Sequence, residues 1–277
     1  MRLPTAPPAP LRLPQRGRPA SRPKRPVSYS HGWNQVAKWY GSYLRGENTY
    51  QETLVFPGAF RLLAPKQGGK YLDLACGEGM FAAAIAAEGA EILGIDIAPA
   101  LIRAAKQKRI SGADFLVADL QKPVSGIPEG VFDGSVCLLA LQNIRDAAPV
   151  FRLAWQALKP GGRFVVVLNH PCFRIPRQSE WGFDEAKKTQ YRRIDRYLSP
   201  MDIPIQMRPG ETAGPRTMSF HRPLSWYMEI ASAAGFFLQG LEEWVSDRES
   251  NAGGRSRAEN RSRAEIPLFL AMSFKKG

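Results

Sequence analysis

Three carboxylates, each at the end of a short apolar run, are the residues of this sequence best placed to do chemistry. Asp73 lies near the end of a strand predicted over Tyr71 to Ala75, and Asp96 and Asp119 follow the runs EILGI and FLVA. Each run has the length and composition of a buried strand. Because parallel strands end at one edge of a sheet, we expect the three carboxylates to gather where α/β folds bind ligands.

A glycine turn follows the first of these strands. The residues CGEG at 76–79 precede a predicted helix, so Gly77 and Gly79 let a ligand approach the backbone and the free N–H groups of the helix. The spacing Gly77-x-Gly79-x-x-Ala82 also fits a dinucleotide fingerprint. Asp73 would repel a pyrophosphate, however, and would attract the cationic amine of S-adenosylmethionine. We therefore expect S-adenosylmethionine at this turn.

The other two carboxylates suit the remainder of that cofactor. Asp96 lies near the distance, roughly 20 residues on, at which nucleotide-binding folds place a ribose-binding carboxylate. Asp119, after the third strand, is placed to accept a hydrogen bond from an adenine amino group. The sequence thus predicts a nucleoside site along one edge of a parallel sheet.

At these residues the chain resembles the class I S-adenosylmethionine-dependent methyltransferases. The motifs that carry the resemblance are LDLACGEG at 72–79, GID at 94–96, VADL at 117–120, FDGSVCLLAL at 132–141 and LKPGGRFVVV at 158–167. It covers roughly Tyr40 to Leu168 and a C-terminal strand. It implies a doubly wound, Rossmann-like α/β fold: a seven-stranded sheet, six strands parallel and the last antiparallel, with helices on both faces.

The resemblance also implies cofactor contacts, which are carried over by position. Asp73, Gly77 and Gly79 would hold the methionine end, Asp96 the ribose, and Asp119 and Leu120 the adenine. Further expected contacts are Tyr40, Ala75, Ile97 and Ala140, the last on a floor formed by residues 139–141. Cys76 departs from the usual family residue, and we expect no chemistry from it.

Charge and proline content divide the chain. The net charge is +13, and Met1 to Pro26 holds seven basic residues, eight prolines and no acid, which leaves +6 for the remainder. Such a tail cannot bury a core, so we expect residues 1–27 to be disordered and 28–277 to form the methyltransferase domain. Within that domain we expect a mobile, polar loop over 246–264. The tail can also be read as a nucleic-acid-binding arm.

A long segment over 169–224 interrupts the alternation of strands and helices and is expected to form a lid over the ligand edge. It is rich in aromatics, and its ten basic and six acidic residues give it a net charge of +4. His170 and His221 are the candidate catalytic bases, because each lies where the lid leaves or rejoins the fold. The alternative is that either histidine has a structural hydrogen-bonding role. Aromatic walls with arginines suit a compact anionic acceptor.

These features favour an enzyme that methylates a small, anionic or aromatic molecule. The alternative is an RNA or protein methyltransferase that uses the basic tail and lid, although no RNA-binding module is recognisable. A non-catalytic cofactor-binding protein and a nicotinamide dehydrogenase are further alternatives. The three cysteines lack metal-ligand spacing and no apolar run reaches the roughly 18 residues of a membrane span. We expect a cytoplasmic protein without metal; the sequence does not indicate an oligomeric state.

Overall fold

The computed structural model of the chain describes Trp33 and residues 48–206 and 216–277. The expected tail and the proposed cofactor contact Tyr40 lie outside these residues. The helices are η1 (Gln51–Val55), α2 (Phe56–Leu63), α3 (Met80–Ala87), α4 (Pro99–Gln107), η2 (Leu141–Asn143), α5 (Ala148–Ala157), α6 (Leu224–Ala233) and α7 (Ser256–Glu265). The strands are β1 (Lys70–Leu74), β2 (Glu91–Asp96), β3 (Ala113–Val117), β4 (Phe132–Leu138), β5 (Leu158–Asn169), β6 (Ser179–Asp184), β7 (Thr189–Ile194), β8 (Met201–Gln206), β9 (Arg216–His221), β10 (Phe236–Trp244) and β11 (Phe269–Lys276).

A seven-stranded sheet is the centre of the molecule, in the order β10-β11-β5-β4-β1-β2-β3. Neighbouring strands from β5 to β3 are parallel, while β11 is antiparallel to both β5 and β10. Six strands therefore run one way and the last runs the other, which confirms the predicted fold class. The carboxyl ends of β1 to β5 meet at one edge, so the loops that follow them share one surface.

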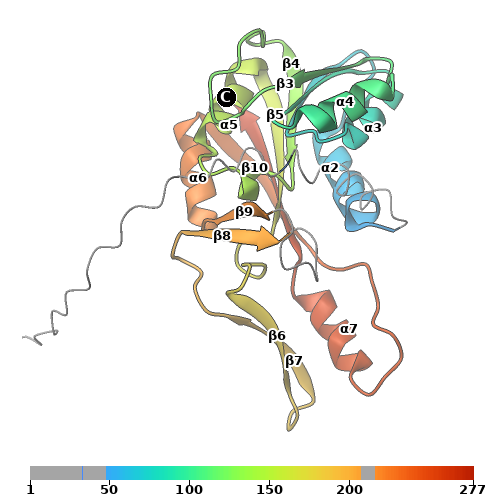
Figure 1. Cartoon of the computed structure of the whole chain (residues 1–277), viewed down its shortest axis with the longest axis vertical. Helices are drawn as coiled ribbons and strands as arrows, with labels where there is room; N and C mark the ends of the chain where they lie inside the picture. Colours follow the sequence, from blue (N-terminus) through green and yellow to red (C-terminus); the bar gives the residue numbers. More distant parts are fainter. Residues whose placement is uncertain (1–32, 34–47, 207–215) are drawn as a thin grey trace, which may run out of the picture.

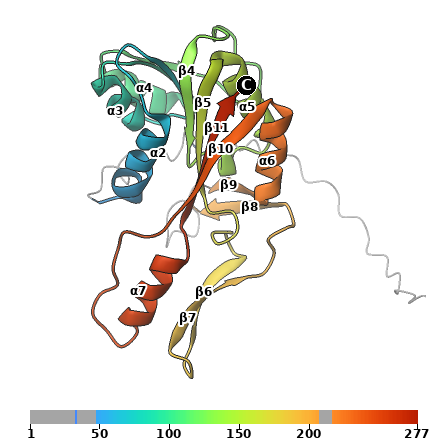
Figure 2. The same ribbon diagram turned by 180° about the vertical axis from the view of Figure 1, so that it is seen from behind.

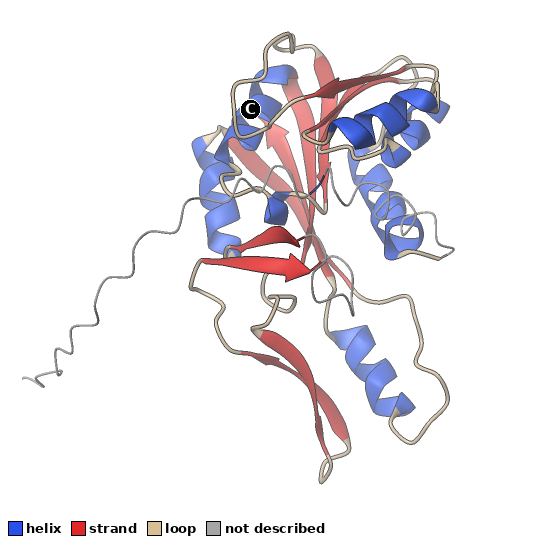
Figure 3. Cartoon of the chain, in the orientation of Figure 1, coloured by secondary structure: helices blue, strands red, loops and turns tan. Residues whose placement is uncertain are grey.

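Helices cover both faces of this sheet (Figure 3). Alternate residues of β5 explain why: Phe164, Val166 and Leu168 pack into the core that includes α5 and α6, whereas Val165 and Val167 pack into the core that includes α2, α3 and α4. A strand buried on both faces must be apolar at every position. The run FVVVL at 164–168 therefore belongs to the interior of a three-layer structure.

One prediction about local structure, the polar loop over 246–264, is wrong. In α2, Pro57 lies in the first turn of the helix, where no N–H is required. The bare Cα of Gly58 faces the ring of Trp244, which would lie 2.4 Å from an added Cβ. The loop expected over 246–264 contains most of α7, whose Ser262 donates a hydrogen bond to the carbonyl of Gln190 at 2.9 Å.

The segment after β5 contains two antiparallel hairpins, β6–β7 and β8–β9. The first hairpin and α7 project together from the carboxyl edge of the sheet in both views (Figures 1 and 2). Arg255, the N-cap residue of α7, pairs with Glu185 and stacks 4.4 Å from the ring centroid of Phe183. The second hairpin lies closer to the sheet, where β9 contacts η2 after β4 (Figure 1). Among the described residues of the insertion, β8–β9 and the loop after β5 therefore border the ligand edge.

Candidate active site

The turn between β1 and α3 keeps its backbone open to a ligand. Ala75, Gly77 and Gly79 have φ of 67°, 59° and 74°, which only glycine adopts without strain. A Cβ on Gly77 would meet nothing within 4 Å, whereas one on Gly79 would lie 2.7 Å from the ring of Phe115. Gly79 is thus required by packing, and Gly77 leaves open space next to the N-terminus of α3.

Asp73 is buried beside this turn with an unpaired oxygen. Its residue is 2% exposed, and its Oδ2 has no hydrogen-bond partner among the described residues. Burial, with a contribution from the nearby Asp96 carboxylate, raises the pKa of Asp73 to about 7. An unpaired buried carboxylate is costly. A cationic amine at the turn would supply the missing donor, so the site fits the ammonium group of S-adenosylmethionine.

Asp96 is held by two backbone amides. Its Oδ2 accepts a hydrogen bond from the N–H of Gly77 at 3.0 Å, and its Oδ1 accepts one from the N–H of Ala98 at 2.8 Å. Burial raises the pKa of Asp96, and these two hydrogen bonds oppose the rise. Each oxygen keeps a second lone pair for a ribose hydroxyl. Asp96 therefore also fixes the glycine turn, a role that the sequence pattern did not indicate.

The remaining expected cofactor contacts lie along the same edge. Asp119 follows β3, accepts a hydrogen bond from the N–H of Gln121 at 3.0 Å and pairs with Lys122 at 3.6 Å. The side chain of Leu120 is buried in the core, and Ile97 is half-buried after β2. Ala140 follows β4 directly after Leu139, whose φ is 53°. The structure thus brings these residues to the ends of four adjacent strands.

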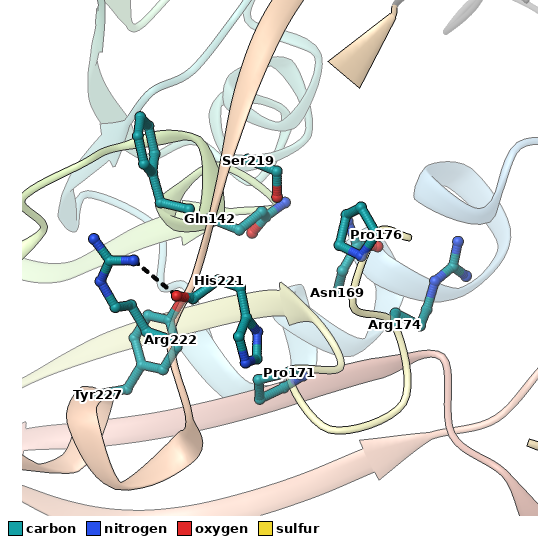
Figure 4. Close-up of a pocket in the computed structure, with 10 residues that line it drawn as sticks. Gln142, Asn169, Pro171, Arg174, Pro176, Ser219, His221, Arg222 and Tyr227 are labelled. Atoms are coloured by element: carbon teal, nitrogen blue, oxygen red, sulfur yellow. Dashed lines mark hydrogen bonds between the residues drawn. The ribbon is translucent and has the colours of Figure 1, made fainter. Parts of the chain in front are cut away.

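A pocket lies next to this row, at the ends of β4 and β5. Figure 4 shows its side chains arriving from η2, from the loop after β5, and from β9 with the residues that follow it. The lining residues are Gln142, Asn169, Pro171, Arg174, Pro176, Ser219, Phe220, His221, Arg222 and Tyr227. They include two arginines and no carboxylate. Since β1, β4 and β5 are neighbours in the sheet and run parallel, the pocket and the glycine turn lie at the same edge of the sheet.

His221 lines this pocket, and one of its ring nitrogens is hydrogen-bonded to the backbone. Its Nε2 lies 2.6 Å from the carbonyl oxygen of Tyr197, which can only accept, so Nε2 carries the proton. No hydrogen bond to Nδ1 occurs within the described part of the chain. Burial, together with the nearby Arg222 guanidinium, lowers the pKa of His221, while the Tyr197 carbonyl opposes this. A neutral imidazole with a bare Nδ1 can accept a proton.

His170 is not a lining residue, and both of its ring nitrogens are engaged. Nε2 lies 2.7 Å from Oε1 of Glu243, and Nδ1 accepts a hydrogen bond from the N–H of Cys172 at 3.2 Å. Its backbone N–H donates to the carbonyl of Leu268 at 2.9 Å. Burial lowers the pKa of His170 despite Glu243. These contacts tie the loop after β5 to β10 and to the start of β11, and they correspond to the structural alternative for His170.

Sequence reasoning missed several pocket residues. Gln142, Asn169, Arg222 and Tyr227 line the pocket without having been assigned a role. Gln142 lies just beyond one predicted strand, and Asn169 lies at the end of another. Their position at strand ends is the sequence signal that could have identified them. Arg222 and Tyr227 reach the pocket only through the fold of β9 and α6. Among the described residues, no cluster of His, Cys, Asp and Glu can hold a metal, and no helix is long and apolar enough to cross a membrane.

Known proteins resemble the chain in both sequence and structure. The model of the methyltransferase domain family matches residues 72–166. The ubiquinone biosynthesis O-methyltransferase of Xylella fastidiosa is 32% identical over 109 residues, which are 38% of this chain and 44% of that protein. This chain therefore spans less than half the length of the curated relative.

Solved structures cover more of the chain. An S-adenosylmethionine-dependent methyltransferase from Mesorhizobium loti superposes with a TM-score of 0.64 at 28% identity, covering 79% of this chain and 96% of the other. One from Clostridium acetobutylicum shares the fold at 17% identity, with a TM-score of 0.57 and coverage of 88% and 99%. The chain therefore contains a methyltransferase domain of the class I, S-adenosylmethionine-dependent kind.

Proposed function

We propose that the protein transfers a methyl group from S-adenosylmethionine to a small acceptor molecule that carries an anionic group. The observation that carries the proposal is the unpaired, buried Oδ2 of Asp73 beside an open glycine turn. When bound, S-adenosylmethionine would supply a methyl group on a sulfonium: a lone pair of the acceptor would bond to the methyl carbon, and the carbon–sulfur electron pair would stay on sulfur, which leaves as a neutral thioether. The protein must bring donor and acceptor together in a dry site.

The cofactor half of the site lies on β1, β2 and β3. Asp73 holds the amine, and the backbone of Gly77 and Gly79 faces the methionine end. Asp96 accepts hydrogen bonds from the ribose hydroxyls, and Asp119 accepts one from the adenine amino group. The half-buried positions Ala75, Ile97 and Ala140 line this region together with Leu120, and Tyr40 stays a predicted contact.

The acceptor half is the pocket beyond β4. Arg222 stands over it with its side chain 15% exposed and lies 3.6 Å from Asp202. A guanidinium has five N–H groups, so this single carboxylate leaves donors for an anion on the acceptor. With Arg174 on the opposite wall and no acidic lining residue, the pocket favours an anionic molecule. His221 is the candidate base, and His170 positions the loop that carries Arg174.

A small acceptor is supported by the lining and by one relative. Side chains from η2, β9 and the loop after β5 converge on the pocket, which suits a compact molecule better than a polymer. The Xylella fastidiosa relative is named for O-methyl transfer in ubiquinone biosynthesis. Both observations favour a metabolite over RNA or protein as the acceptor.

Calorimetric titration tests the cofactor assignment. S-Adenosylmethionine and S-adenosylhomocysteine should bind with one site per chain, and NADH should not bind. A chain that binds NADH as tightly as S-adenosylmethionine, or that binds neither cofactor, would overturn the proposal. Two results together would instead favour a nucleic-acid acceptor. The protein would bind a mixed RNA pool in a salt-dependent way, and this RNA would compete with a metabolite extract as the acceptor of labelled methyl groups.

A further inference from the structure

The N-terminus of α6 receives a hydrogen-bond acceptor from a distant part of the chain. Its N-cap residue, Pro223, makes no side-chain capping hydrogen bond, so the first N–H groups of the helix need acceptors elsewhere. The N–H of Leu224 donates a hydrogen bond to Oη of Tyr197 at 3.0 Å. Tyr197 precedes Leu224 by 27 residues and lies between β7 and β8. The phenol of Tyr197 therefore holds the start of α6.

The backbone of the same tyrosine holds His221, the last residue of β9. The carbonyl oxygen of Tyr197 lies 2.6 Å from Nε2 of His221, and the centroids of the two rings lie 6.1 Å apart. A carbonyl oxygen only accepts hydrogen bonds, so Nε2 carries the hydrogen of the neutral imidazole and Nδ1 keeps the lone pair. Tyr197 thus contacts both ends of the segment 221–224, once through its backbone and once through its side chain.

This segment forms part of the wall of the acceptor pocket. His221 and Arg222 both line the pocket (Figure 4). Nη1 of Arg222 donates a hydrogen bond to the carbonyl of His221 at 2.7 Å, so the two side chains are coupled through the backbone between them. The position of the segment 221–224 therefore decides where the candidate base and this guanidinium lie.

The phenol of Tyr197 also fixes the position of its own carbonyl. In the described part of the chain, no backbone-to-backbone hydrogen bond involves residues 196–199. Leu198, the next residue along, is 73% exposed. Since neither a ladder nor a buried neighbour side chain holds this stretch of backbone, we expect the hydrogen bond between Oη and Leu224 to keep the carbonyl of Tyr197 opposite His221.

We propose that Tyr197 is a positioning residue for His221: its carbonyl selects the Nε2–H tautomer, and its phenol, bonded to Leu224, keeps that carbonyl in place. This proposal rests on the proposed function, in which His221 is the candidate base. Tyr197 acts through His221 and needs no contact with the cofactor or the acceptor. Nδ1, and not Nε2, is then the nitrogen through which His221 can take a proton.

Nitrogen-15 spectra of the imidazole rings test this without a methyl acceptor. The chain has three histidines, and the signals lost in His221→Gln identify those of His221. In the wild type, Nε2 of His221 should carry the hydrogen and Nδ1 should be bare. Tyr197→Phe removes only the hydroxyl, and the ratio of the Nε2–H to the Nδ1–H tautomer should fall about two- to tenfold, the loss expected from one weakened hydrogen bond.

Two controls locate the effect. Tyr191→Phe removes the hydroxyl of a tyrosine on β7 that is 49% exposed, and it should leave the ratio unchanged. His170 is an internal reference in the same spectra, because its Nδ1 accepts a hydrogen bond from the N–H of Cys172 and its tautomer should not respond to Tyr197→Phe. A structural loss that spreads through the whole protein would change both histidines.

An unchanged tautomer ratio of His221 in folded Tyr197→Phe would overturn the proposal, and so would a hydrogen on Nδ1 in the wild type. Amide exchange at Leu224 is a second readout that needs no variant. This N–H should be protected in the wild type, and exchange as fast as in an unfolded chain would overturn the proposal even where Tyr197→Phe does not fold.

The outcomes separate this proposal from the proposed function. If S-adenosylhomocysteine binds and the tautomer ratio does not respond to Tyr197→Phe, the role of Tyr197 fails and methyl transfer stands. If neither S-adenosylmethionine nor S-adenosylhomocysteine binds, methyl transfer fails, and a base at His221 fails with it.

Discussion

Replacing Asp73 by asparagine should raise the free energy of unfolding of the unliganded protein and lower its affinity for S-adenosylmethionine. Burial and the Asp96 carboxylate raise the pKa of Asp73 from 3.8 to about 7. The folded state therefore binds this proton more tightly than the unfolded chain. The contribution of Asp73 to the free energy of unfolding falls as the pH rises from about 4 to about 7. Above pH 7 the carboxyl is ionised in the folded state too, and the loss reaches its full value. At about 1.4 kcal/mol per pH unit, this cost is about 4 kcal/mol.

Asparagine removes the charge but adds a buried amide, which without a partner costs about 1–3 kcal/mol. The net gain in the free energy of unfolding at pH 8 should thus be about 1–3 kcal/mol, from the difference between these two terms. It should shrink towards pH 5, where the wild-type carboxyl is mostly protonated. Urea unfolding at pH 5 and pH 8 measures both values. An Asp73→Asn protein that is less stable than the wild type at pH 8 would refute the reasoning.

The same substitution should weaken the binding of the cofactor. Losing a hydrogen bond between charged groups costs about 1.5–3 kcal/mol, which is roughly 10- to 150-fold in the dissociation constant for S-adenosylmethionine. Wild-type affinity should rise with pH through about 7 as Asp73 ionises, and the variant should lack this dependence. Calorimetry at several pH values measures it. An unchanged affinity in the folded variant would show that the amine does not bind Asp73.

Four further substitutions test other parts of the site. Asp96→Ala should lower the affinity for S-adenosylmethionine by roughly 10- to 150-fold in calorimetry, and unchanged affinity would show that Asp96 does not bind the cofactor. Gly79→Ala should lower the free energy of unfolding by about 1–3 kcal/mol, because its methyl meets a phenylalanine ring at 2.7 Å. Gly77→Ala, with open space, should cost only about 1 kcal/mol, and equal losses in urea unfolding would contradict this steric reason. His170→Ala should cost about 1–3 kcal/mol in the same assay because the buried imidazole is removed and the N–H of Cys172 loses its acceptor, while cofactor affinity stays constant; a large loss of cofactor affinity would place His170 in the cofactor site.

The fold was predictable because its signals are local. Apolar runs such as FVVVL, glycines at 77 and 79, and carboxylates at strand ends each act through their own stretch of backbone. Parallel strands joined by right-handed crossovers then bring those strand ends to one edge without further information. The sequence by itself therefore determined the parallel strands and the row of Asp73, Asp96 and Asp119, while the number of seven strands was implied by the resemblance to class I methyltransferases.

The acceptor pocket was decided only by tertiary structure. His170 and His221 are alike in sequence, yet the first is held by Glu243 and the second faces the pocket, because β9 folds back on η2. The helical part of 246–264 likewise packs against β7 from a distant part of the chain. Hydrogen-bond partners and burial belong to contacts between segments far apart in sequence. They set the tautomer of His221 and the raised pKa of Asp73, and no local pattern encodes them.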